Sequence, residues 1–159
     1  MPITVNLTTR PEIVDFPNSH YVFIERVGNI PANAPGAWKA FDKFMPVLME
    51  HNQITAPAGV YALNREANRE IYRAGFLLAA PPVSLPAEIR YERLSGGRYV
   101  RFMLTGPFDQ LPEATKRAFE IIAEEKISLG DGFNIEQYLT DPSTTPADQN
   151  ITAILFTVA

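Results

Sequence analysis

The chain has 159 residues, 46% of them hydrophobic, so it can bury one sizeable core without a metal or cofactor, and we expect neither. Its 14 basic and 18 acidic residues give a net charge of −4, which favours no direct binding of nucleic acid. The absence of cysteine excludes disulfides, thiolate nucleophiles and sulfur-ligated zinc, and leaves His20 and His51 as the nitrogen ligands. No signal peptide or membrane-spanning run is recognisable, so we expect a cytoplasmic protein with no membrane partner.

The spacing of apolar residues predicts the order of elements along the chain. They are an extra strand or tail over 1–10, strands over 12–16 and 21–27, a helix over 37–52, strands over 60–63, 70–78, 88–94 and 98–105, a helix over 110–126, and strands over 134–140 and 151–158. Residues 28–35 are expected to form a loop. Asp109 is the expected cap of the second helix.

Short connections between neighbouring strands predict three hairpins. Pro17-Asn18-Ser19 separates the strands over 12–16 and 21–27, and a polar segment over 64–69 separates the next pair. Ser95-Gly96-Gly97 gives the strongest signal, because glycine supplies the positive φ that tight hairpin turns require.

An internal repeat relates the two halves of the chain. Tyr21-Val22 and Gly28 match Tyr99-Val100 and Gly106 at a constant offset, and Phe41 matches Phe119 at that same offset. Each half then consists of a strand, a glycine turn, a helix and two further strands. We expect one domain over residues 1–159, with half-repeats over 11–80 and 88–159.

Two such halves predict an α+β fold with a pseudo-twofold repeat of strand-helix-hairpin units. Their strands would form antiparallel sheet with both helices packed on one face. The other face would then be open to a ligand or a partner, and we expect the functional residues there.

Strand alternation selects Glu136 and Tyr138 as candidates for that second face. In the strand over 134–140, Ile135 is expected to face a helix, so Glu136 and Tyr138 would point the other way. An unpaired carboxylate is costly in a dry core and reasonable in a cleft. The alternative is an exposed edge-strand glutamate, or one paired with Arg73 or Arg101.

Aromatic residues on the strands are the second group of candidate ligand-binding residues. Alternation places Val22 and Phe102 toward the helices, which leaves Phe23 and Met103 for the second face, while Tyr72 and Phe76 share a face. Aromatic rings around one carboxylate would suit a lipophilic cation, although an aromatic stripe is also ordinary core. No complete nucleophile triad or phosphate loop is present.

Several short segments stand out together: Glu12-Ile13-Val14, Gly28, the helix with Trp38, Leu104-Thr105-Gly106-Pro107-Phe108, Ile135-Glu136-Gln137-Tyr138-Leu139 and Asp141-Pro142. With them the chain resembles the GyrI-like small-molecule-binding domain, the effector-binding module of AraC-type and MerR-type multidrug-sensing transcription regulators. The resemblance covers about residues 12–158. It implies a pseudo-twofold fold with a ligand cleft between the halves.

The resemblance also implies roles for single residues. The glutamate of the Glu-x-Tyr strand is the acidic residue that meets cationic aromatic ligands in this family, and its match is Glu136. The resemblance also implies aromatic cleft walls at Tyr138, Tyr72, Phe76 and Trp38. Strand position alone adds Phe23, Met103 and Tyr61 to the candidate ligand-binding residues. No helix-turn-helix accompanies the module in this sequence, so we expect a stand-alone protein.

Three functions are compatible with this pattern. The first is a stand-alone protein that binds, senses or sequesters hydrophobic, cationic small molecules, a partner class that aromatic rings around one glutamate favour. The second is a hydrolase of strained electrophilic natural products, in which Glu136 acts as general base beside Tyr138. The third is a gyrase-inhibitor-like interaction protein, for which no surface is marked. The oligomeric state is not predicted.

Overall fold

The computed structural model describes residues 5–28, 30–52, 54–64, 69–94, 96–130, 134–141 and 144–159. Its Cα positions form two compact units, which are described separately below. Unit 1 comprises residues 1–16 and 98–159, and unit 2 comprises residues 17–97.

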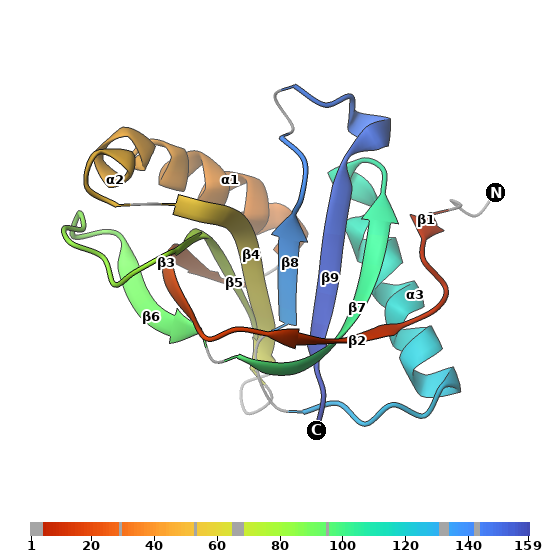
Figure 1. Ribbon diagram of the computed structural model, residues 1–159. Coiled ribbons are helices and arrows are strands. Elements are labelled where there is room, and N and C mark those ends of the chain that lie inside the picture. Colours follow the sequence, from red (N-terminus) through yellow and green to blue (C-terminus); the bar gives the residue numbers. More distant parts are fainter. Residues whose placement is uncertain are drawn as a thin grey trace. The chain divides into compact units, whose positions relative to one another are not determined.

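Unit 2 is a four-stranded antiparallel sheet with helices on one face. Its elements are β3 (Ser19–Val27), α1 (Ile30–Asp42), α2 (Met45–His51), β4 (Ile54–Asn64), β5 (Arg69–Leu78) and β6 (Arg90–Leu94). The strand order is β4-β5-β3-β6, and α1 packs on β3 and β5 (Figure 1). Its core includes Val22 and Ile24 of β3 against Phe41 and Leu48 of the helices.

Unit 1 repeats this arrangement with a second set of elements (Figure 1). They are β1 (Asn6–Leu7), β2 (Glu12–Phe16), β7 (Gly97–Thr105), the 3-10 helix η1 (Phe108–Gln110), α3 (Leu111–Glu124), β8 (Asn134–Tyr138), the 3-10 helix η2 (Ala147–Gln149) and β9 (Ile151–Thr157). The strand order is β1-β7-β9-β8, and β2 also pairs with β7. The apolar face of α3, which includes Ala118 and Ile122, packs against Phe102 and Phe156 of the sheet.

The predicted repeat is confirmed by the glycines that end β3 and β7. Gly28 and Gly106 have φ values of 128° and 149°, a region that residues with a Cβ rarely adopt. The Gly28 N–H donates to the Glu70 carbonyl, and the Gly106 N–H donates to the Asn150 carbonyl, each over 2.8 Å. In both units the glycine therefore redirects the chain from the first strand into the helix.

Two of the three predicted hairpins are wrong. β2 pairs with β7 and not with β3, and β6 pairs with β3 and not with β7. Strands β2 and β6 are thus exchanged relative to the predicted half-repeats over 11–80 and 88–159. The two turn segments instead bond to each other, because the Gly96 N–H donates to Asn18 Oδ1 over 2.7 Å. The third hairpin, β4 with β5, is confirmed and is longer than predicted.

The predicted helix over 37–52 is two helices, and the predicted loop over 28–35 is largely helical. Pro46 lies in the first turn of α2, where a missing N–H costs no hydrogen bond, so the chain breaks just before it. Pro35 lies inside α1, which begins at Ile30. Asp109 is not a cap, because it lies in η1, and Gln110 precedes α3 without a side-chain capping bond. The strand option for residues 1–10 is confirmed by β1, which pairs with β7.

Replacing Gly36 by alanine is expected to stabilise the protein by about 0.5–1 kcal/mol, because glycine in a helix interior loses more backbone entropy on folding than alanine. Gly36 lies inside α1, is exposed, and a Cβ built on it meets nothing within 4 Å. Urea unfolding measures the change. Gly106→Ala is the matched control and should destabilise, since φ is positive there and the new Cβ would lie 2.6 Å from Gln110 Oε1. A neutral or destabilising Gly36→Ala would contradict the argument.

Candidate ligand-binding site

Glu136 is a buried carboxylate in the middle of β8 in unit 1. Its exposed fraction is 7%, and its Oε1 accepts a hydrogen bond from the Tyr138 hydroxyl over 3.1 Å. Burial raises the pKa of Glu136 to about 7, and the hydrogen bond from Tyr138 opposes that rise. Among the described residues no basic side chain forms an ion pair with it, since Arg101 pairs with Glu12 and Arg73 with Glu25 and Glu92.

The predicted face of Glu136 is wrong. Glu136 is in register with Ile154 of β9, and Ile154 belongs to the core against α3. Opposite residues of an antiparallel pair point to the same face, so Glu136 and Tyr138 lie on the helix-covered face and Ile135 on the other. The Tyr138 ring packs edge-on against Phe108, with the ring centres 5.3 Å apart. The helix-covered face of unit 1 therefore carries the acidic candidate.

Three of the predicted aromatic residues form a cluster in unit 2. Trp38 of α1 donates a hydrogen bond from Nε1 to the Tyr72 hydroxyl over 2.7 Å. Its ring also packs edge-on against Phe76, with centres 5.8 Å apart, and Phe76 stacks on Phe41. As predicted, Tyr72 and Phe76 share a face of β5, which is the face that α1 covers. Trp38 and Phe76 are only partly buried, so this cluster has accessible aromatic surface.

Phe23 and Met103 each lie on the face of their own sheet that the helices do not cover, as alternation predicted. Phe23 is in register with Gly75 and Met103 with Ala153, and neither belongs to the helix-facing cores. They are therefore separated from the acidic and aromatic candidates of their own units. The side chain of the last predicted site residue, Tyr61 of β4, lies outside the described part of the structure.

The ring of Phe23 packs against a basic and an aromatic side chain of unit 2. The Arg73 guanidinium lies 4.4 Å from the ring centre and Tyr21 stacks on the ring at 5.0 Å. Arg73 is buried, and it donates to Glu25 over 2.9 Å and to Glu92 over 2.8 Å. Arg73 is therefore a buried cation held by two glutamates and the Phe23 ring. We assign Phe23 to this network.

Thr152 is a buried polar residue that the sequence analysis did not select. It is fully buried on β9, and its Oγ1 has no hydrogen-bond partner among the described residues. It is in register with Tyr138, so it lies on the same face as Tyr138 and Glu136. The signal was present in the sequence as a hydroxyl directly before the apolar run Ala153–Phe156.

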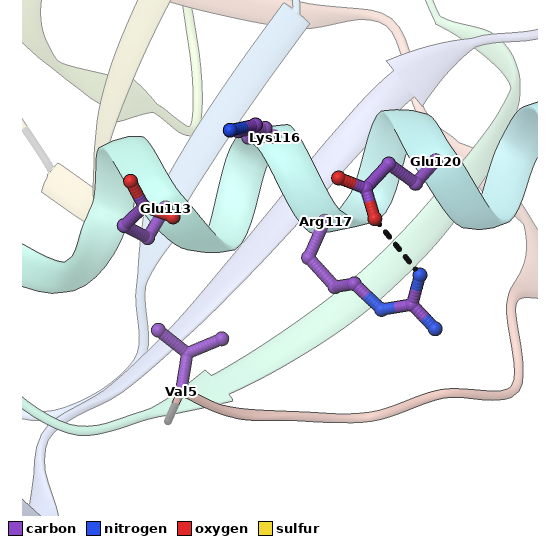
Figure 2. Close-up of a pocket in the computed structure, with 5 residues that line it drawn as sticks. All are labelled: Val5, Glu113, Lys116, Arg117 and Glu120. Carbon is purple, nitrogen blue, oxygen red and sulfur yellow. Dashed lines mark hydrogen bonds and ion pairs between the residues drawn. The ribbon is translucent and has the colours of Figure 1, made fainter. Parts of the chain in front are cut away.

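A hollow beside α3 contains none of these candidate residues. Val5, Glu113, Lys116, Arg117 and Glu120 line it, and Figure 2 shows the Arg117–Glu120 ion pair at its edge. Most of its lining side chains are charged, and Arg117 and Glu120 form an ion pair. Within the described ranges, no group of three or more histidine, aspartate or glutamate residues could hold a metal ion. None of the helices described is long and apolar enough to cross a membrane.

The chain belongs to the GyrI-like small-molecule-binding domain family. The family model matches residues 9–159, which is nearly the whole chain. The buried glutamate of β8 and the two repeated units are thus found in a domain whose family is defined by small-molecule binding. No curated protein matches the sequence.

Solved structures of low sequence identity share the fold. EcmrR, solved by cryo-EM with DNA, superposes with a TM-score of 0.75 at 13% identity, over 94% of this chain and 57% of EcmrR. The chain thus spans little more than half of that protein. SAV2435 bound to tetraphenylphosphonium gives a TM-score of 0.70 at 13% identity, over 94% of both chains. A hydrolase from Listeria innocua gives 0.61 at 14% identity, over 96% of this chain and 93% of the hydrolase.

Proposed function

We propose that this protein binds hydrophobic, cationic small molecules and that Glu136 supplies the negative charge they meet. The observation that carries the proposal is the burial of this carboxylate without a basic partner among the described residues. An isolated buried carboxylate is costly to ionise, and a bound cation would offset that cost. SAV2435, which shares the fold, was solved with such a cation. The role would be sensing or sequestration of the ligand in the cytoplasm.

Aromatic side chains are proposed as the apolar part of ligand recognition. Tyr138 lies beside Glu136 in unit 1, and Trp38, Tyr72 and Phe76 form the aromatic cluster of unit 2. Aromatic faces attract cations and also bury large apolar area, so both groups suit an aromatic cation. The two groups are proposed independently, each from the contacts within its own unit.

Glu136→Gln is the variant that tests the proposal, because it keeps the size of the side chain and removes its charge. We expect it to weaken binding of methyltriphenylphosphonium by about 30-fold or more, since a charged partner is lost at a poorly solvated position. Binding of the neutral triphenylphosphine oxide should change little. Isothermal titration calorimetry at about pH 8 measures both ligands.

Glu125→Gln is the matched control, because it removes the same charge from an exposed position at the end of α3. Its effect on either ligand should be within about twofold, since solvent and salt screen an exposed charge. The proposal fails if Glu136→Gln binds the cation as tightly as the wild type, or if the charged and neutral ligands lose affinity equally.

Hydrolysis of strained electrophiles is the second candidate function. A carboxyl group with a pKa of about 7 that is hydrogen-bonded to a tyrosine suits a general base at neutral pH. The fold match to the Listeria innocua hydrolase is consistent with it. In that case Glu136→Gln would still bind neutral aryl epoxides, and their turnover would fall by about 100-fold or more. Turnover of aryl epoxides by the wild type and the variant distinguishes the two functions.

A further inference from the structure

The Thr152 hydroxyl is unusual because it is buried and has no hydrogen-bond partner in the part of the chain that the structure describes. The residue is fully buried, and neither a backbone nor a side-chain group of the described residues bonds to Oγ1. Valine has nearly the same shape and would leave no polar atom unpaired, so threonine is the less stable choice at this position. The rest of β9 from Ala153 to Phe156 is apolar.

The position of Thr152 connects it to the acidic candidate. Thr152 is the register partner of Tyr138, and Ile154 is the register partner of Glu136. Side chains of register partners lie about 5 Å apart at Cβ, and diagonal neighbours on one face about 7–8 Å apart. The Thr152 hydroxyl is therefore beside the tyrosine that bonds to Glu136 and diagonal to Glu136 itself.

We infer that Thr152 is a specificity residue of the Glu136 site, with its hydroxyl accepting a hydrogen bond from the ligand. This inference rests on the proposed function. A cation that carries N–H groups can place its charge at Glu136 and donate one N–H to Thr152 Oγ1. A quaternary ammonium or phosphonium has no such donor and leaves the hydroxyl unpaired. The preferred ligand class is thus a protonated amine attached to an aromatic group.

The test compares two ligands on the same scaffold, biphenylmethylammonium and its N,N,N-trimethyl derivative. Thr152→Val removes only the hydroxyl, and we expect it to weaken binding of the primary ammonium by about 5- to 10-fold, the usual scale of one hydrogen bond. Binding of the trimethyl derivative should change by less than about twofold, because that ligand cannot donate to Oγ1. Thr152→Ser restores a hydroxyl and should recover most of the affinity for the primary ammonium.

Thermal unfolding without ligand gives a second, independent readout. Thr152→Val should raise Tm by about 2–4 °C, since the unpaired buried hydroxyl is gone. A fall in Tm would show that the hydroxyl has a structural partner, and would overturn the inference. It is also overturned if Thr152→Val weakens both ligands equally or neither.

Glu136→Gln separates this inference from the proposed function. If that variant weakens both ligands while Thr152→Val changes neither, cation binding stands and only the role of Thr152 is wrong. If neither ligand binds the wild type, the proposed function fails and the inference fails with it.

Discussion

Between pH 4.5 and pH 8 the wild type is expected to lose about 3 kcal/mol of unfolding free energy that the Glu136→Gln variant retains. The reason is the pKa of Glu136, which rises from 4.5 to about 7 because the folded protein buries the carboxyl group. In this pH range the folded state holds a proton that the unfolded state has released. Stability therefore falls as the pH rises, and the loss is complete once the pH is above the folded pKa.

Urea unfolding at several pH values measures this difference. Glutamine cannot titrate, so the curve of the variant should lack the decline attributable to Glu136. Burying the glutamine amide adds a cost that does not depend on pH, so it shifts the whole curve of unfolding free energy against pH and leaves its slope unchanged. Glu125→Gln should keep the wild-type slope, because Glu125 is exposed. Parallel curves for the wild type and Glu136→Gln would show that this carboxyl group is not buried in the folded protein.

The same linkage makes cation binding pH-dependent. A cation requires the ionised form of Glu136, so its affinity should fall by about tenfold for each pH unit below 7. The instability that the ionised carboxylate causes in the free protein is thus the energy that a bound cation recovers. This relation is the physical link between the fold of unit 1 and the proposed function.

The sequence predicted the features that local patterns determine. The periodicity of residues 110–126 predicts an apolar face that includes Ala118 and Ile122, and α3 has that face. The matched glycines Gly28 and Gly106 predict the repeat because each local backbone conformation needs a residue without a Cβ. These features depend on a few neighbouring residues, so they can be inferred without knowing the distant strands.

The predictions that were wrong concern features that depend on distant parts of the chain. Pro17-Asn18-Ser19 and Ser95-Gly96-Gly97 both have the composition of hairpin turns, but turn composition does not decide which strand a chain pairs with next. The predicted face of Glu136 was wrong because residues on both faces of β8 are buried. Ile135 is as buried as a helix-facing residue, so its hydrophobicity does not reveal its face. Strand alternation selected Glu136 as a candidate, and the family motif added its expected role as the acidic residue of the ligand site.

Gly75→Ala is expected to destabilise the protein by about 4 kcal/mol or more, because a Cβ at this position would overlap the neighbouring strand. It would lie 2.0 Å from the Val22 carbonyl oxygen and 2.8 Å from Phe23 Cα. Both neighbours are backbone atoms of β3, so a side-chain rotation cannot relieve the contact. The strands would have to separate at the Phe23–Gly75 register position, in the middle of the β3–β5 pair.

The consequences would extend across the helix-free face of unit 2. The Phe23 Cβ also lies 2.8 Å from the position of the new methyl group, and the Phe23 ring carries the Arg73 guanidinium and the Tyr21 ring. Moving Phe23 would disturb the buried Arg73 and its pairs with Glu25 and Glu92, and leaving a buried guanidinium unpaired is itself costly. Urea unfolding, or the soluble yield if the variant does not fold, measures the effect beside Gly36→Ala. If Gly75→Ala stays within about 1 kcal/mol of the wild type, the two strands do not approach as closely as described.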